Sequence, residues 1–131
     1  MITEMEAVME RKNQKKILII DDEIGPRESL KILFKDNYEV NLAKDGLEGL
    51  ATMEKEAYDL VILDLKMSGL GGIEVLRQLR EARQQTKVII LTGYGSHEIA
   101  QEAQRLGVTA YLNKPFDVFD IRQLVARVIN A

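Results

Sequence analysis

The segment Ile17-Leu18-Ile19-Ile20-Asp21-Asp22-Glu23 places four consecutive aliphatic residues directly before three carboxylates. Two similar aliphatic runs follow, at residues 60–63 and 88–91, and Asp64 comes directly after the first of them. Continuous aliphatic runs of this length are typical of strands that are buried on both faces, and such strands belong to parallel sheets covered by helices. The three runs therefore predict the centre of a parallel sheet.

Amphipathic segments of helix length separate these runs, and weaker apolar runs at residues 40–43 and 110–112 supply two more strands. Each helix has a start signal, which is a first-turn proline, a glycine or a short polar capping residue. The five signals are Pro26, Asp45, Gly72, Ser96 and Asp117. A strand and a helix thus alternate five times. Because such crossovers are right-handed, the order predicts an α/β fold, a three-layer doubly wound (βα)5 sandwich.

The composition fits a single globular domain, with 131 residues, 46% hydrophobic and 30% charged. The absence of cysteine and the single histidine, His97, exclude disulfide frameworks, thiolate metal sites, cysteine nucleophiles and paired-histidine metal sites. A net charge of −3 argues against direct nucleic-acid binding. No apolar stretch approaches the ~20 residues that span a membrane, and no signal peptide is evident, so we expect a cytoplasmic protein.

In doubly wound sheets, ligands bind beyond the carboxyl ends of the strands, where the strand order reverses. This edge is predicted to hold Asp21, Asp22, Asp64, Thr92 and Lys114. Like charges about 4 Å apart repel by roughly 4 kcal/mol at an effective dielectric constant near 20, so we expect a cation to offset the repulsion. Oxygen ligands suit magnesium, manganese or calcium. Carboxylates, such a cation, a lysine and a hydroxyl are together the parts of a phosphoryl-transfer site.

At these residues the sequence resembles the receiver domain of two-component response regulators. The matching motifs are Ile20-Asp21-Asp22-Glu23, Asp64-Leu65-Lys66-Met67 with Gly72 beyond it, Thr92-Gly93 and Lys114-Pro115-Phe116. The resemblance extends over about residues 15–130. It implies a flavodoxin-like parallel sheet of strand order 2-1-3-4-5, with an N-terminal arm at residues 1–14 and a receiver domain at residues 15–131.

The resemblance also implies the chemistry of the site. Asp64 would accept a phosphoryl group from a sensor histidine kinase or a histidine phosphotransfer protein. Asp22 and Asp64 would ligate Mg²⁺, or Mn²⁺ in its place, together with the backbone carbonyl of Lys66. Asp21 would act mainly through a bound water.

Other matching residues would bind the phosphoryl group and undergo a conformational change when it is attached. Thr92 and Lys114 would bind the transferred group, and a cis Lys114–Pro115 peptide bond would aim the lysine at the site. Tyr111 falls at the switch aromatic of the family, which turns inward when the threonine moves toward the phosphate. The alternative for Tyr111 is an ordinary packed aromatic side chain.

Three positions give this sequence its individual character. Ser68 stands where the family usually has a proline, four residues after the phosphoacceptor, which leaves the stiffness of the loop at 68–72 open. Lys66 and Tyr94 lie where the family tunes the rate of self-dephosphorylation.

The predicted function is a phosphorylation switch and not an enzyme beyond weak self-phosphorylation and self-dephosphorylation. The face formed by the fourth helix, the fifth strand and the fifth helix would change its partner preference and could form a homodimer. The chain would be a stand-alone receiver or the receiver part of a longer transcriptional regulator. One alternative is a constitutive dimerisation module with vestigial phosphorylation. A flavin or nucleotide enzyme is disfavoured, because Asp21-Asp22-Glu23 would repel the phosphates of its ligand.

Residues 1–14 precede the first predicted strand. Thr3 and Glu6 have the spacing of a helix capping box, so a short helix and a disordered arm both fit. We prefer a weakly ordered arm.

Overall fold

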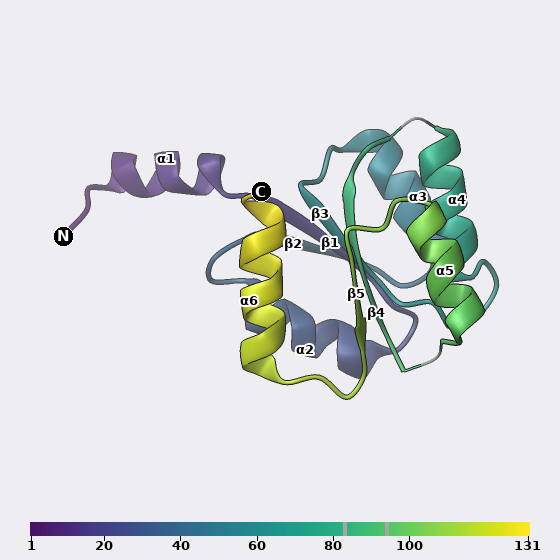
Figure 1. The fold of residues 1–131 in the computed structure, drawn as a ribbon. Coiled ribbons are helices and arrows are strands. Elements are labelled where there is room, and N and C mark those ends of the chain that lie inside the picture. Colours follow the sequence, from purple (N-terminus) through teal and green to yellow (C-terminus); the bar gives the residue numbers. More distant parts are fainter. Residues whose placement is uncertain (83, 94) are drawn as a thin grey trace.

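The computed structural model of the chain contains a five-stranded parallel sheet with helices on both faces (Figure 1). It describes residues 1–82, 84–93 and 95–131, with the backbone alone for residues 9–13. The strands are β1 (Lys16–Ile20), β2 (Glu39–Ala43), β3 (Leu60–Leu63), β4 (Lys87–Thr92) and β5 (Ala110–Asn113). The helices are α1 (Glu4–Asn13), α2 (Ile24–Phe34), α3 (Gly46–Lys55), α4 (Gly72–Glu81), α5 (His97–Arg105) and α6 (Val118–Ile129).

The strand order is β2-β1-β3-β4-β5, and every neighbouring pair is parallel. This confirms the predicted doubly wound sheet of order 2-1-3-4-5. The order reverses at β1, because the chain leaves β1 to form β2 on one side and returns to form β3 on the other. The edge beyond β1 and β3 is therefore the place where a ligand is expected.

Alternate residues of the central strands pack into two separate cores. Leu18 and Ile20 join a buried cluster with residues of α3, α4 and α5. Ile17 and Ile19 join a second cluster with residues of α2 and α6. All four side chains are fully buried. A run of four consecutive aliphatic residues is thus explained, since each face of the strand needs an apolar side chain.

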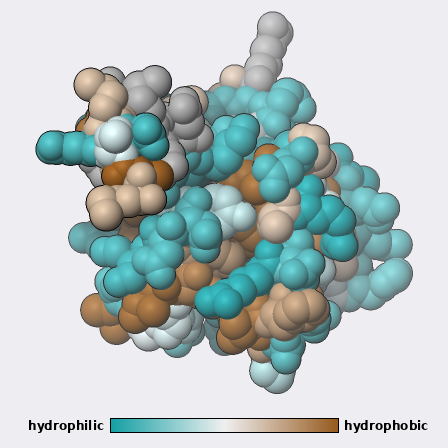
Figure 2. Space-filling view, turned by 90° about the vertical axis from the view of Figure 1, so that its left-hand side faces the viewer, coloured by the Kyte–Doolittle hydropathy of each residue, from teal (hydrophilic) through white to brown (hydrophobic). Residues whose placement is uncertain are grey.

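The α2 and α6 side of the molecule carries apolar side chains at its surface as well. Figure 2 views the molecule from this side and shows hydrophobic patches among hydrophilic side chains. Ile32 of α2 and Phe119 of α6 are 64% and 66% exposed. In the part of the chain that the structure describes, no helix combines the length and the apolar character needed to cross a membrane.

The predicted helix start signals lie in the first turn of a helix or just before it. Pro26 is in the first turn of α2, and Gly72 is the first residue of α4. Three predicted capping side chains accept backbone N–H groups from the first turn that follows them. These are Asp45 with Glu48 (2.8 Å), Ser96 with Ile99 (3.2 Å) and Asp117 with Phe119 (2.8 Å) and Asp120 (3.2 Å).

The N-terminal segment forms helix α1, where we preferred a weakly ordered arm. The Thr3 hydroxyl accepts the N–H of Glu6 at 3.1 Å, and the Thr3 carbonyl accepts the N–H of Ala7 at 3.0 Å. The capping signal in the sequence therefore outweighs the short length of the segment. α1 extends away from the sheet in Figure 1, and Met5 is exposed.

Gly72 allows α4 to begin directly against the strand end that carries Asp64. A Cβ at this position would overlap the carbonyl oxygen of Asp64 and would lie 2.7 Å from the Cα of Leu65. The N–H of Gly72 also donates to the Leu65 carbonyl at 3.0 Å. A larger residue at position 72 would therefore require the backbone behind Asp64 to shift.

We expect Gly72→Ala to lower the free energy of unfolding by about 1–3 kcal/mol, because the added methyl group must push backbone atoms apart. Gly25→Ala is the matched control, since a Cβ there meets nothing within 4 Å. The control should be neutral or stabilising by up to ~1 kcal/mol, because alanine is the better helix former. Urea unfolding followed by circular dichroism measures both, and an unchanged Gly72→Ala midpoint would contradict the close packing.

Candidate functional site

The register of the sheet brings Asp21 and Asp64 together. Ile20 at the end of β1 pairs with Leu63 at the end of β3, so the next residue of each strand lies at the same level. The N–H of Asp64 donates to the carbonyl of Ile20 at 3.1 Å. Asp21 is 2% exposed and Asp64 is 6% exposed. Two carboxylates therefore lie side by side in a nearly buried position.

Lys114 links the two buried carboxylates. Its Nζ lies 3.4 Å from Oδ2 of Asp21 and 3.3 Å from Oδ2 of Asp64. The N–H of Lys114 donates to the carbonyl of Thr92 at 2.9 Å, which continues the pairing of β4 and β5. The Lys114–Pro115 peptide bond is cis, as predicted. One ammonium group is thus shared between two acids.

The pKa values in the cluster of Asp21, Asp64 and Lys114 depend on burial and on the lysine that the two acids share. Burial raises the pKa of Asp21, and the charge of Asp64 adds to the rise. The N–H of Glu23, at 2.9 Å, and the ammonium of Lys114 lower the pKa of Asp21 without cancelling the effect of burial. Burial lowers the pKa of Lys114, but the charges of Asp64 and Asp21 outweigh it and the net pKa is raised. With both carboxylates ionised, one ammonium would face two negative charges, and a further cation could offset the difference.

A hollow of about 340 Å³ opens beside this cluster. It is lined by Asp22, Glu23, Lys66, Met67 and Ser68. One oxygen each of Asp21, Asp22 and Glu23 lie within 4.8 Å of one another. This donor set contains oxygen atoms without nitrogen or sulfur, which fits a hard divalent cation such as Mg²⁺ or Mn²⁺.

The structure brings most of the predicted metal ligands to one place. Asp22 and Lys66 border the same hollow, and Asp21 contributes an oxygen to the acidic group. The carboxylate of Asp64 is outside that group, and its Oδ1 accepts the N–H of Lys66 at 3.3 Å. Glu23 belongs to the group although we did not predict it as a ligand; its position directly after Asp22 was the available signal.

Thr92 and Tyr111 lie on the two strands beyond β3. Thr92 is fully buried at the end of β4. Tyr111 is in register with Ile90 and packs, partly buried, against the core shared by α3, α4 and α5. A Cβ at Gly95 would overlap the Tyr111 hydroxyl, so the tyrosine reaches the segment that follows Thr92. Burial raises the pKa of Tyr111.

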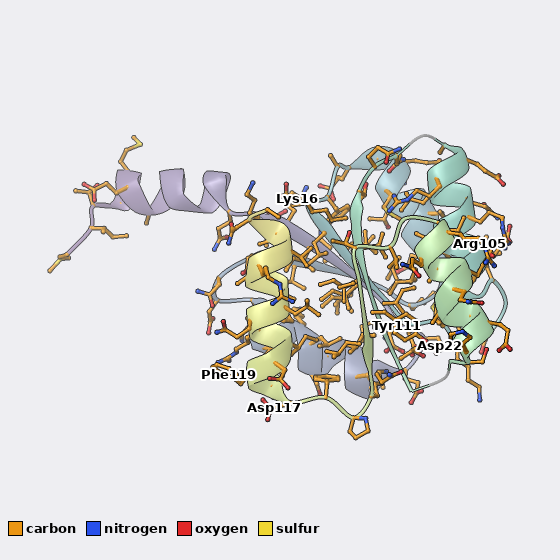
Figure 3. The ribbon with its side chains drawn as sticks, in the orientation of Figure 1. Lys16, Asp22, Arg105, Tyr111, Asp117 and Phe119 are labelled. Carbon is orange, nitrogen blue, oxygen red and sulfur yellow. The ribbon has the colours of Figure 1, made fainter. Side chains whose placement is uncertain are left out.

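The predicted site residues lie at one end of the sheet. Figure 3 shows Asp22 and Tyr111 at this end, opposite Lys16 at the start of β1. Tyr94, which we expected to influence dephosphorylation, lies outside the described residues. The roles of the individual side chains stay predictions, but their common location follows from the parallel sheet.

The comparison with protein families and curated proteins gives a consistent result. The response regulator receiver domain family matches residues 17–126. Sporulation initiation phosphotransferase F of Bacillus subtilis is 40% identical over 115 residues, which cover 87% of this chain and 93% of the relative. Other curated relatives are longer, and the aligned regions cover 49% and 24% of two of them.

Solved structures of receiver domains have the same fold. A CheY-like receiver domain protein from Methanospirillum hungatei superposes with a TM-score of 0.86 and 32% identity, covering 90% of this chain and 95% of that one. The response regulator TrrA from Thermotoga maritima, in complex with Mg²⁺-BeF, superposes with a TM-score of 0.77 and 34% identity. That match covers 87% of this chain and 98% of TrrA.

We expect Asp21→Asn to raise the melting temperature of the metal-free protein at neutral pH. Because the pKa of Asp21 is raised, the fold favours the protonated carboxyl and carries an electrostatic cost when Asp21 is ionised. The advantage of the variant should be present above that pKa and should disappear as the pH falls through it. Thermal unfolding in chelator over a pH series measures the effect.

The exposed Asp36 supplies the control for this experiment. Asp36→Asn should change the free energy of unfolding by less than about 0.5 kcal/mol at each pH. A lower melting temperature for Asp21→Asn at neutral pH would show that the ion pair with Lys114 outweighs the burial of the charge.

Proposed function

Because this chain belongs to the response regulator receiver domain family, we propose that it is a phosphorylation switch in which Asp64 accepts a phosphoryl group from a histidine of a partner protein. The partner class is a sensor histidine kinase or a histidine phosphotransfer protein. The observation that carries this proposal is the Lys114 ammonium, which lies within 3.4 Å of both Asp21 and Asp64. From this position, the lysine can also pair with the negative charge of a phosphoryl group attached to Asp64.

The transfer uses the carboxylate of Asp64 as the nucleophile. One of its oxygens attacks the phosphorus, the bond from phosphorus to the histidine nitrogen breaks, and the bonding electrons leave with the imidazole. The attached group adds negative charge and acceptor oxygens. Lys114 is in position to pair with that charge, and the Thr92 hydroxyl on the neighbouring strand end supplies a hydrogen-bond donor.

The acidic hollow suits a divalent cation, and we propose Mg²⁺, with Mn²⁺ as a substitute. Asp22, Asp64 and the backbone carbonyl of Lys66 would hold it, and Asp21 would act through a water. When bound, the cation would neutralise charge on the transferred oxygens. The support from this chain is the oxygen donor set of Asp21, Asp22 and Glu23.

The output of the switch would be a change at the face formed by α5, β5 and α6. Thr92 stands at the site end of β4, and Tyr111 packs beside the segment that follows it. Next to Tyr111, a surface hollow of about 450 Å³ extends over β5 and α6 and includes the exposed Phe119. A movement of Thr92 toward the phosphoryl group would thus alter a surface that can bind a partner or a second copy of the chain.

The chain would alter its own state and would not turn over a substrate, apart from slow self-phosphorylation and self-dephosphorylation. It would act in the cytoplasm, either alone or as the receiver part of a longer transcriptional regulator. The net charge of −3 favours a protein partner over nucleic acid for this domain.

Incubation with acetyl phosphate and Mg²⁺ should add the mass of one phosphoryl group to the intact protein. Asp64→Asn should abolish the gain, because the amide is not a nucleophile for phosphorus, whereas the exposed Asp36→Asn should retain it. Intact-mass spectrometry at neutral pH measures all three proteins. A parent protein that gains no mass, or an Asp64→Asn variant that still does, would refute the assignment.

Beryllofluoride with Mg²⁺ should shift backbone amide resonances of α5, β5 and α6, including Tyr111, as well as those at the strand ends. Thr92→Ala should keep the shifts around Asp64 but lose most of the remote ones, since the hydroxyl is the proposed link. Two-dimensional NMR and sedimentation, each with and without beryllofluoride, provide the measurement. Shifts confined to the strand ends, with an unchanged sedimenting mass, would instead support a constitutive dimerisation module.

A further inference from the structure

Ser68 makes two hydrogen bonds to a single oxygen of Asp22. Its N–H donates to Oδ2 at 2.8 Å, and its hydroxyl donates to the same atom at 3.1 Å. The two residues are 46 positions apart in the sequence and come from different loops. A proline at position 68 could make neither bond, because it has no N–H and no hydroxyl. The link is therefore a consequence of the serine at this position.

The loop that carries Ser68 is anchored independently of Asp22. On either side of Ser68, Met67 and Leu70 pack against the core shared by α3, α4 and α5. Gly69, with a φ of +75°, makes the turn between Ser68 and Leu70. The two donors of Ser68 thus belong to a loop that is packed against the core, and the carboxylate of Asp22 accepts both of their hydrogen bonds.

The hydrogen bonds fix the orientation of the Asp22 carboxylate. Both converge on Oδ2, and Oδ1 takes no part in them. Asp22 and Ser68 line the same hollow, and Asp22 also belongs to the acidic group in which Asp21, Asp22 and Glu23 bring one oxygen each within 4.8 Å of one another. Hydrogen bonds to a ligating carboxylate orient it, and their removal lowers metal affinity by about 10–100-fold in metalloproteins.

We propose that Ser68 is a positioning residue that orients Asp22 for a divalent cation and so raises the Mg²⁺ affinity of the site. This inference rests on the proposed function to the extent that the acidic hollow binds the cation. The opposite effect would follow if the serine competed with the cation for Asp22. The geometry favours orientation, because both Ser68 donors bind Oδ2 and neither of them binds Oδ1.

The test is the Mg²⁺ affinity of the unphosphorylated protein, measured by calorimetry and checked by the electron spin resonance of added Mn²⁺. Ser68→Ala removes the hydroxyl donor alone and should weaken binding by about 10-fold. Ser68→Pro also removes the N–H and should approach a loss of about 100-fold. Ser68→Thr keeps both donors and should bind like the parent.

Ser29→Ala is the matched control, since Ser29 is exposed on α2 and is not among the residues that line the acidic hollow. It should bind Mg²⁺ like the parent. The melting temperature of each variant in chelator shows whether the fold is intact. If Ser68→Pro does not fold, Ser68→Ala decides.

The outcomes separate this inference from the proposed function. Equal or tighter Mg²⁺ binding by Ser68→Ala would overturn the role of Ser68, while Mg²⁺ binding and acetyl phosphate labelling of the parent would leave the proposed function standing. A parent that binds no Mg²⁺ would overturn both. Weaker binding by Ser68→Ala, with threonine restoring it and the metal-free melting temperature unchanged, would support the inference.

Discussion

The contact of Lys114 with two buried carboxylates is the constraint on which the rest of the site depends. Unpaired buried charges are strongly unfavourable, so the fold must bring an ammonium to Asp21 and Asp64. That requires β1, β3 and β5 to end at the same edge of the sheet, which the parallel order provides. It also leaves one positive charge for two negative ones. The site can therefore accept a further positive charge. A site of this kind is consistent with chemistry at a phosphoryl group.

Much of the fold could be predicted because its signals are local. Four consecutive aliphatic residues at 17–20 indicate a strand covered on both faces, and each of its side chains is indeed in one of two cores. The capping residues indicate where helices begin. The strand order came from the resemblance to receiver domains, because hydrophobic periodicity identifies strands without saying which of them are neighbours. The structure of the N-terminal segment was harder to predict, because a helix of 10 residues is only marginally stable by its length. Its capping by Thr3 favours the helix.

The location of the site residues in the fold could be predicted, but the contacts between their side chains could not. Strand ends of a parallel sheet share an edge, so the meeting of Asp21, Asp64 and Lys114 follows from the order of the elements. The participation of Glu23 and the link from Ser68 to Asp22 depend on how two loops approach each other. No periodicity records the direction of a side chain in a loop, and residues 46 positions apart carry no mutual signal in a single sequence.

Asp21 and Asp22 show why neighbouring residues of the same type can have different tasks. Asp21 follows directly after β1 and is buried against Lys114 and Asp64, whereas Asp22 borders the open hollow with Ser68. The lysine stabilises the buried pair, and the serine holds the carboxylate at the rim. Gly72 allows close packing of the backbone behind Asp64, because a side chain at position 72 would overlap the Asp64 carbonyl oxygen. Under the proposed function, a cation held with the help of Asp22 would offset the negative charge that Lys114 leaves unpaired, so its affinity would influence how readily Asp64 is phosphorylated.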